Sequence, residues 1–434
     1  MLVTGVGLVT PLGNSVDVTW KRLLAGDRVG RVLECSDIDH HQQLSSIEGL
    51  RLYGAPVNSA GLRQALVESK LLANFPPDVV HTWLSEPLVA MSLLAYIEAI
   101  TQARLADTFT SRRWNSGTRA AVVYGSSKGG LRTAERLTEL MRSNVAYDQP
   151  STSIATEFDI LWQHAFATDS ATRAIAVISG ATAGVSCPVA ACATGLISVL
   201  QGAAMIRSGQ CDVCIVGSAD AGLRASVMAS FHRLRVTSRH ADPANACRPF
   251  DADRDGFLIG EGAGVLILES RRHAESRGVP GIARVVGGQW LSDPTGMTQI
   301  DQSGSIVAEV LQRSFRKHDF LPEIISVHGT GTESNDLAEA RGIDAALEHN
   351  APDCFGVKGA MGHLLGAAGS VETILTILAL RDQTIPGTTN LQNKDPHCKL
   401  RLASTSKSWP GLQRAAKLSL GFGGHVACGM FERE

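Results

Sequence analysis

The sequence predicts an α/β protein built from alternating strands and helices. Short apolar strands, glycine-rich turns and apolar helices follow one another along the chain, and this alternation is typical of layered α/β folds. The order strand, glycine-rich turn, helix, strand occurs twice. The repeated order predicts two similar halves, residues 1–272 and 273–434, although they share little letter-by-letter identity.

Length and composition predict one large, tightly packed globule. The 434 residues suffice for about three ordinary domains or fewer large ones. The formal net charge of −2 gives no reason to expect a nucleic-acid binder or a protein attracted to anionic membranes. Nine scattered cysteines and an N-terminus without a signal-peptide pattern predict a cytoplasmic protein with free thiols.

In the first half, apolar runs and turn residues place the strands. Strands are expected at Leu2–Val9, Ala120–Gly125, 212–217 and 264–269, with a turn at 10–13, a glycine-rich turn at 125–130 and mostly helical structure over 19–106. Residues 174–206 carry no charge, but their glycines and hydroxyl side chains predict buried strand, loop and helix rather than a membrane span. The helix after Cys192 is expected to stop near Gly209.

The second half repeats this alternation. A strand is expected from about Ile282, followed by a helix at 303–317, a strand at 323–328, helices at 336–348 and 363–381, and strands near 415–420 and 425–432. Asp336 and Glu339 stand at the spacing of a capping box.

Cys192 is the first candidate functional residue. It lies in the segment AACATG, where an apolar stretch turns into a helix with one apolar face. A helix N-terminus favours negative charge, so this position is expected to lower the pKa of the thiol and expose it as a nucleophile. An inert buried cysteine is the alternative for any single cysteine.

Two histidines occupy similar junctions. His328 ends an expected strand and opens a loop that carries Thr330 and Thr332. Catalytic groups of α/β proteins lie at such strand ends. His363 is expected at the start of the helix 363–381, where the helix dipole disfavours an imidazolium and favours a neutral, hydrogen-bond-donating imidazole. Taken singly, each histidine is also compatible with a structural role.

Lys358 and Glu372 are charges in apolar surroundings, so each is expected to have a polar partner. Other chemistries are disfavoured. The pair Cys211 and Cys214 has no second metal-binding pair, and the acidic run from Asp251 lacks the glutamate that a calcium loop needs at its twelfth position. The chain has neither a phosphate loop nor a dinucleotide fingerprint. No metal or nucleotide cofactor is therefore expected.

Together these sites resemble the β-ketoacyl-acyl-carrier-protein synthase family, in its elongating branch with one cysteine and two histidines. The similarity runs over nearly the whole chain, through AACATG, RPFDADRDGFLIGEGAGVLILE, VHGTGTESNDLAEA, KGAMGHLLGAAGSVETI and SLGFGGH in the family's order. Residues 35–118 and 150–185 match only loosely. These regions are expected to shape the acyl pocket and the dimer interface.

The resemblance implies a thiolase fold, with two similar halves in a five-layered α-β-α-β-α core. It implies decarboxylative Claisen condensation of a cysteine-bound acyl chain with a malonyl unit on acyl carrier protein, without a cofactor. The resemblance implies that Cys192 is the nucleophile and that His328 and His363 promote decarboxylation, supported by Lys358 together with Glu372. It implies that the backbone amides of Cys192 and Phe422 form the oxyanion hole and that the Phe422 side chain gates the thiol. It also implies that Thr330 and Thr332 line the pantetheine channel.

The resemblance also implies partners. Acyl carrier protein would dock near Arg235, for which simple solvation is an equal alternative, and the chain would form a homodimer. Neither nucleic acid nor membrane insertion is expected. A non-catalytic partner subunit of the chain-length-factor type is the alternative function, but such subunits typically replace the cysteine. Thiolases and initiating synthases have Cys-His-Cys or Cys-His-Asn sets, whereas this chain has a second histidine in KGAMGH.

Overall fold

The structure, a computed structural model, describes residues 1–34, 37, 52–69, 71–106, 108, 114, 117–144, 152–347 and 351–434. Its centre is one eleven-stranded sheet in the order β12-β10-β9-β14-β15-β8-β1-β7-β6-β4-β5. The strands are β1 (Leu2–Val9), β4 (Ala120–Gly125), β5 (Gly184–Ser186), β6 (Val213–Asp220), β7 (Gly262–Glu269), β8 (Ala283–Ser292), β9 (Ile324–Ser326), β10 (Asp353–Phe355), β12 (Arg401–Leu402), β14 (Arg414–Gly421) and β15 (His425–Arg433).

The strand order repeats between the two ends of the sheet. When the edge strand β12 is set aside, one end reads β1-β7-β6-β4-β5 and the other reads β8-β15-β14-β9-β10. Each end then contains its first, fifth, fourth, second and third strand in that sequence. The directions repeat as well, with two antiparallel pairs followed by two parallel pairs. The ends join where β1 pairs with β8. The predicted similarity of the two halves thus appears as a shared strand topology. The predicted boundary at 272/273 stays a prediction; it falls within helix α12 (Arg271–Ser276).

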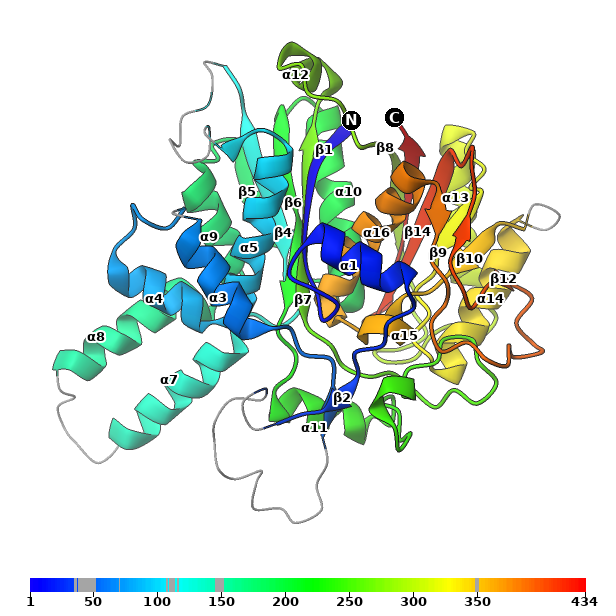
Figure 1. Cartoon of the computed structure of the whole chain (residues 1–434), viewed down its shortest axis with the longest axis horizontal. Helices are drawn as coiled ribbons and strands as arrows, with labels where there is room; N and C mark the ends of the chain where they lie inside the picture. Colours follow the sequence, from blue (N-terminus) through cyan, green and yellow to red (C-terminus); the bar gives the residue numbers. More distant parts are fainter. Residues whose placement is uncertain are drawn as a thin grey trace.

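Helices form three layers around this sheet, as Figure 1 shows. Between the two ends of the sheet lie α10 (Thr194–Arg207) and α16 (Ala368–Asp382), which pack on β6 and β14 respectively and on each other. On one outer face α5 (Pro87–Gln102) and α9 (Ser170–Ser179) cover β1 and β4. On the other, α13 (Ser305–His318) covers β8 and carries α14 (Glu333–Leu347). The result is the expected five-layered core.

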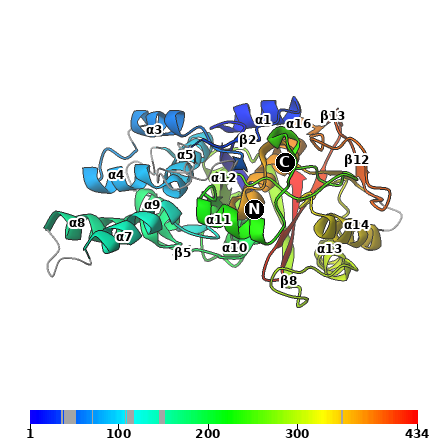
Figure 2. The same cartoon turned by 90° about the horizontal axis from the view of Figure 1, so that it is seen from below.

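The remaining elements are short or peripheral. They are α1 (Val16–Leu24), α3 (Ser59–Glu68), α4 (Pro77–Ser85), α7 (Leu131–Asn144), α8 (Thr152–Leu161) with a π-helical extension (Trp162–Phe166), α11 (Ala225–Arg233), α15 (Lys358–Met361), 3₁₀ turns at Ala191–Ala193, Pro243–Asn245 and Leu365–Ala367, and the small strands β2 (Arg31–Val32), β3 (Tyr53–Gly54), β11 (Thr384–Ile385) and β13 (Lys407–Ser408). Figure 2 shows that α7 and α8 project from the side of the molecule that carries α4 and α9.

The two central helices cross so closely that only glycine fits at the contact. A Cβ atom on Gly195 would lie 2.2 Å from the backbone nitrogen of Ser370, and one on Gly369 would lie 2.4 Å from the nitrogen of Leu196. Ser218 of β6 and Ser370 share a hydrogen bond of 2.7 Å at the same place. This crossing brings the first turns of α10 and α16 together, although they belong to different halves.

Several expected boundaries move. The helix expected over 363–381 begins at Ala368, after α15 and a 3₁₀ turn, so His363 lies in the connection rather than at the helix start. The helix expected from residue 336 begins at Glu333, so Asp336 is not its N-cap. Residues 19–106 contain β2 and β3 besides helices, and part of that range lies outside the described residues.

The uncharged stretch 174–206 folds as predicted, into the end of α9, strand β5, a 3₁₀ turn and most of α10. Among the described residues no single helix is both long and apolar enough to cross a bilayer, and α4 and α5 meet that length only as a pair bent by 101°.

Candidate active site

Cys192 lies in the tight turn that leads into α10. The turn, Ala191–Ala193, is a 3₁₀ helix, and Ala191 holds a positive φ of 46°, a strained value for a residue with a side chain. Thr194 fastens the turn, because its hydroxyl accepts from the amide of Ala190 at 2.9 Å and donates to the carbonyl of Ala191 at 2.8 Å. The thiol is thereby held directly before the first turn of the helix.

His363 lies beside this thiol. Its Nε2 atom is 3.1 Å from Cys192 Sγ. The backbone N–H of Leu365 donates to His363 Nδ1 at 3.3 Å, which makes Nδ1 an acceptor and assigns the ring proton to Nε2. Phe257 packs edge-on against the imidazole with ring centres 5.1 Å apart. His363 therefore presents an N–H donor to the sulfur.

His328 faces His363 from within the same half of the fold, two residues beyond the end of β9. The two rings meet edge to face with centres 5.4 Å apart. Glu339 of α14 accepts the backbone N–H of His328 and, at 2.8 Å, that of Gly329. Lys358 Nζ lies 3.4 Å from His328 Nδ1, and since an ammonium only donates, Nδ1 is again the acceptor and Nε2 carries the proton.

Lys358 and Glu372 have the partners that the sequence analysis expected. Lys358 Nζ pairs with Glu372 Oε1 at 2.7 Å and donates to the carbonyl of His328. The second carboxylate oxygen, Oε2, pairs with Lys417 of β14 at 2.6 Å. All three side chains are buried. One carboxylate thus joins two ammonium groups behind the histidines.

A cavity of about 440 Å³ opens onto the thiol. Besides Cys192, His328 and His363, four further residues that the sequence analysis assigned to the site line this cavity: Thr330, Thr332, Phe422 and Arg235. The two threonine hydroxyls share a hydrogen bond of 2.9 Å, and Arg235 is exposed at the cavity. The structure therefore brings every predicted site residue to one place, with Lys358 and Glu372 directly behind the wall.

Phe422 follows a glycine that contacts the turn at Ala191–Ala193. A Cβ atom on Gly421 would lie 2.7 Å from the carbonyl oxygen of Ala190 and 3.1 Å from the backbone nitrogen of Cys192. The Phe422 ring packs against Phe231 at 6.4 Å between centres. The backbone amides of Cys192 and Phe422 therefore lie on two segments that contact each other through Gly421.

Burial sets the protonation of the site. It raises the pKa of the Cys192 thiol to about 11, against a smaller lowering by Lys128 and Lys358. The expectation of a lowered thiol pKa is therefore wrong, because desolvation outweighs the nearby positive charges. Burial, assisted by Lys358 and the other nearby cations, lowers the pKa of both His328 and His363 well below the usual range. His363 is neutral as expected, although not through the dipole of a helix that starts there.

Sequence reasoning missed three buried charges around the site. Lys417 is a lone lysine in an apolar strand, which is the signal that should have found it. Glu339 was assigned to a capping box, whereas it binds the backbone of His328. Asp220 accepts from the hydroxyl of Ser126 at 3.0 Å and from the amide of Gly366 at 2.7 Å, so it ties the glycine-rich turn at 125–130 to the segment after His363.

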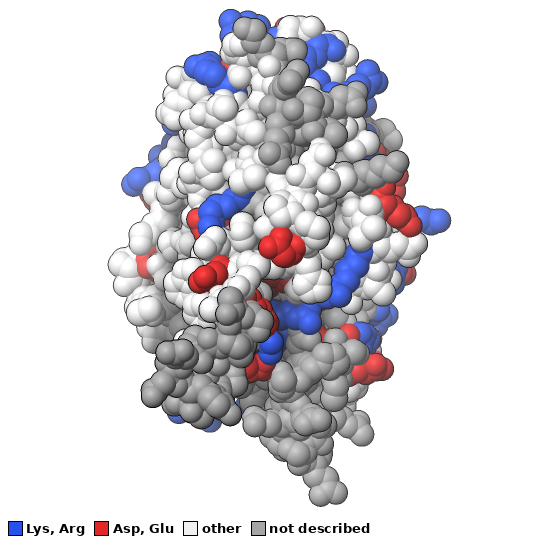
Figure 3. All heavy atoms as spheres, turned by 90° about the vertical axis from the view of Figure 1, so that its left-hand side faces the viewer, with Lys and Arg blue, Asp and Glu red and all other residues white. Residues whose placement is uncertain are grey.

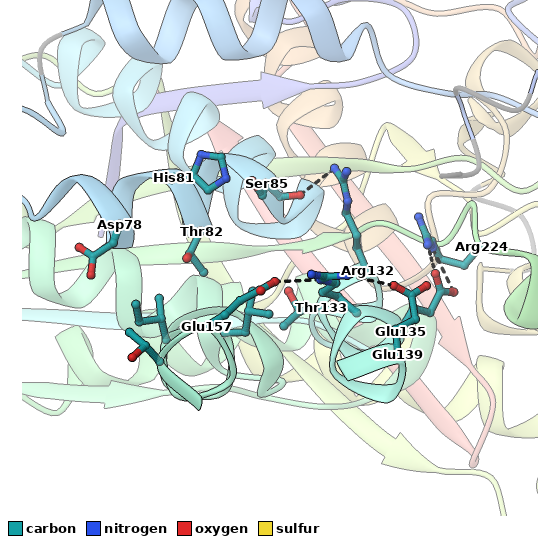
Figure 4. Close-up of a pocket in the computed structure, with 14 residues that line it drawn as sticks. Asp78, His81, Thr82, Ser85, Arg132, Thr133, Glu135, Glu139, Glu157 and Arg224 are labelled. Carbon is teal, nitrogen blue, oxygen red and sulfur yellow. Dashed lines mark hydrogen bonds and ion pairs between the residues drawn. The ribbon is translucent and has the colours of Figure 1, made fainter. Parts of the chain in front are cut away.

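A larger cavity of about 650 Å³ lies elsewhere, among α4, α7 and α8. In Figure 4 dashed lines join Arg224 to Glu135. Arg136, which also lines this cavity, pairs with Glu157 at 2.8 Å. Figure 3 shows acidic and basic groups interspersed on the face of the molecule around these helices. None of the predicted site residues lines this cavity, so the chemistry is assigned to the smaller one.

A cysteine facing two neutral histidines, at the junction of two topologically equal α/β halves, is the arrangement of a thiolase-fold condensing enzyme. Comparison with known families agrees with this class. Residues 1–274 match the family model "Beta-ketoacyl synthase, N-terminal domain" and residues 282–392 match "Beta-ketoacyl synthase, C-terminal domain". The chain belongs to the β-ketoacyl synthase family and is an acyl-transferring enzyme.

Individual relatives match over nearly their full length. The chain is 32% identical to 3-oxoacyl-[acyl-carrier-protein] synthase 2 of Mycobacterium bovis, covering 100% of this chain and 97% of the relative. It is 31% identical to the mitochondrial 3-oxoacyl-[acyl-carrier-protein] synthase of Arabidopsis thaliana, covering 99% and 92%. A β-ketoacyl synthase from Burkholderia phymatum superimposes with a TM-score of 0.80 at 25% identity, covering 100% and 99%.

A further solved structure matches in fold. It is a type II polyketide ketosynthase in complex with its acyl-carrier protein, with a TM-score of 0.81 at 24% identity, covering 100% of this chain and 98% of that one.

Proposed function

We propose that the protein elongates acyl chains by decarboxylative condensation with a malonyl thioester, with Cys192 as nucleophile and the two histidines as hydrogen-bond donors. The 3.1 Å approach of His363 Nε2 to Cys192 Sγ, beside the ring of His328, carries this proposal. In the first half-reaction Sγ attacks the carbonyl carbon of an acyl thioester, and the leaving thiol takes up the cysteine proton. Oxygen charge develops near the amides of Cys192 and Phe422, and one such donor is typically worth about 3 kcal/mol.

In the second half-reaction the malonyl carbon–carboxylate bond breaks and carbon dioxide leaves. The remaining electron pair forms an enolate, whose oxygen accepts from the Nε2–H groups of His328 and His363. The enolate carbon attacks the acyl group on Cys192, and the sulfur leaves as a thiolate that takes up one proton from the solvent. Because loss of carbon dioxide drives the step and the donors stabilise the enolate, the reaction needs neither a metal nor an organic cofactor. The covalent intermediate predicts ping-pong kinetics.

Mass spectrometry of each half-reaction tests these roles. Incubation with an acyl-carrier-protein thioester should add one acyl group to the Cys192 peptide, and malonyl-carrier protein should then remove it as elongated product. Cys192→Ala should not acylate, whereas Cys187→Ala, which changes a half-buried free thiol nearby, should acylate normally. His363→Ala should acylate but condense poorly. Acylation of the Cys192→Ala variant would contradict the assignment of Cys192 as the nucleophile.

The carrier is proposed to be acyl carrier protein, entering past Arg235. Support comes from the exposed position of Arg235 at the cavity that holds the thiol, and from the related ketosynthase that is solved with its acyl-carrier protein. Arg235→Glu should raise KM for acyl-carrier protein about tenfold, because reversing a rim charge slows association. Arg313→Glu on α13 is the control. Equal KM values for both variants would leave Arg235 as a solvated side chain.

We also propose a homodimer that forms along β5. This strand ends the sheet, and exposed strand edges pair readily with another chain. Val185 on it and Val189 just beyond it are 51% and 57% exposed. Val185→Asp should shift the mass measured by light scattering from dimer to monomer, and Val67→Asp on α3 should not. A wild-type monomer at micromolar concentration would contradict the proposal.

The proposed location is the cytoplasm. All eight cysteines in the described residues are free thiols, which fits a reducing compartment. The alternative of a non-catalytic partner subunit gains no support from a site in which the thiol, both histidines and the lysine lie together.

A further inference from the structure

Lys417 is a buried cation that the reaction as proposed above does not use. It lies in the middle of β14, and its side chain is fully buried. Its ammonium pairs with Glu372 Oε2 at 2.6 Å and donates to the carbonyls of Leu418 at 2.6 Å and Val327 at 3.0 Å. A buried ammonium is costly unless it is paired and hydrogen-bonded, so this position needs the surrounding acceptors.

The contacts of Lys417 belong to a larger pattern around His328. Strand β9 ends at Ser326, and from there the backbone is satisfied by charged side chains. The Lys417 ammonium donates to the carbonyl of Val327 and, at 3.4 Å, to that of Ser326. The Lys358 ammonium donates to the carbonyl of His328. The Glu339 carboxylate accepts hydrogen bonds from the N–H groups of His328 and Gly329. The segment that carries His328 is thus held by two cations on one side and one acid on the other.

We propose that Lys417 is a positioning residue for the decarboxylation half-reaction: its ammonium fixes the backbone that carries His328 and places a second positive charge behind the two histidines. The inference rests on the proposed function and deepens it. Lys417 touches neither the thiol nor the cavity; it acts through Val327 and through Glu372, which it shares with Lys358. Acyl transfer to Cys192 does not depend on it.

The second charge matters because both histidines must stay neutral. Protonation would put a hydrogen on Nδ1, and in His363 that atom already accepts from Leu365, while in His328 it faces the Lys358 ammonium. The charged groups around the rings are Lys358, Lys417, Lys128, Glu372 and Glu339, from five different segments. Burial lowers the pKa of both rings, Lys358 and Lys417 lower it further, and Lys128 adds to this lowering at His363. Removing Lys417 therefore raises the pKa of each ring and moves the acid limb of decarboxylation to higher pH.

Lys417→Met tests this inference, because methionine has a similar length and no charge. Acylation of Cys192 is followed by mass spectrometry, and carbon dioxide release from malonyl-carrier protein is followed against pH. Acylation should stay within about twofold, while decarboxylation should fall about 10- to 100-fold, as for a displaced catalytic group. In the pH profile of decarboxylation, the midpoint of the acid limb should move to higher pH by about one unit. Lys399→Met, at an exposed pair with Asp344, should change neither.

The inference is overturned if a folded Lys417→Met protein loses both half-reactions equally, or if its acid limb stays in place. Should that variant not fold, Lys417→Gln takes its place, since an amide still donates to the carbonyls but carries no charge. The same shift of the acid limb is then expected, and an unchanged limb refutes the role of the charge. Wild-type protein that neither acylates nor releases carbon dioxide would instead refute the proposed function.

Discussion

His363 Nε2 lies 3.1 Å from Cys192 Sγ, although 171 positions of sequence separate the two residues. The contact exists because α10 and α16 cross at Gly195 and Gly369 with almost no space between their backbones. Each half of the duplicated fold contributes one short turn before its central helix. The site forms where these turns meet, so the Cys192 thiol and the His363 imidazole depend on the same helix crossing.

Alkylation of Cys192 should remain slow at neutral pH and accelerate steadily with alkali. Burial raises the thiol pKa to about 11, and only the thiolate reacts. The rate with iodoacetamide should therefore rise about tenfold per pH unit between pH 7 and 9. Peptide mass spectrometry of the Cys192 fragment measures it, with Cys192→Ser as the blank. A rate that levels off between pH 7 and 8 would mean that the thiolate is stabilised far more than the structure indicates.

Glu372→Gln should destabilise the protein strongly. The carboxylate pairs with two buried ammonium groups, and breaking a buried pair from one side typically costs about 3–5 kcal/mol, because the remaining charge stays uncompensated. Urea unfolding at pH 7 measures the loss. Asp344→Asn removes the exposed pair with Lys399 and should cost no more than about 1 kcal/mol. Similar losses for both variants would argue against a buried charge network.

Glu339 should make stability depend on pH. Burial raises its pKa from 4.5 to about 7, so between these values the folded protein holds a proton that the unfolded chain releases. Stability from this group is complete below pH 4.5 and is lost as pH rises through 7. Relative to that of Glu339→Gln, the free energy of unfolding of the wild type should therefore fall by about 3 kcal/mol between pH 4.5 and 7. Unfolding free energies of both proteins at several pH values test this prediction. A difference between the two proteins that does not change with pH would disprove it.

Gly421→Ala should impair acylation. Its Cβ would press on the carbonyl of Ala190 and the amide of Cys192, so the turn that carries Cys192 must shift. A displacement of this kind reduces rates by about 100-fold when it reaches 1 Å. Gly61→Ala in α3, where a Cβ meets nothing closer than 3.7 Å, is the matched control and should acylate at the wild-type rate. Equal rates for both variants would show that the turn tolerates the added methyl group.

Long apolar strands and glycine-rich turns were predictable because their signals are local. Leu2–Val9 and Ala120–Gly125 appear at the expected bounds, and the helix after Cys192 stops before Gly209. The start of the helix after His363 was not predictable, since two short turns with helical composition precede it. Residues 38–51, within the region of loose family resemblance, lie outside the described residues.

The sequence by itself determined the alternation of strands and helices, the duplication and the family resemblance, and it predicted the thiol, histidines and lysine of the site. Only the tertiary structure decided how these groups are charged and held. The thiol pKa depends on desolvation, which outweighs the local helix dipole. Lys417 donates to the carbonyl of Val327, 90 positions away in sequence, and Glu339 of α14 accepts the amide of His328. Burial and long-range contacts are properties of the packed chain, and no local pattern of residues encodes them.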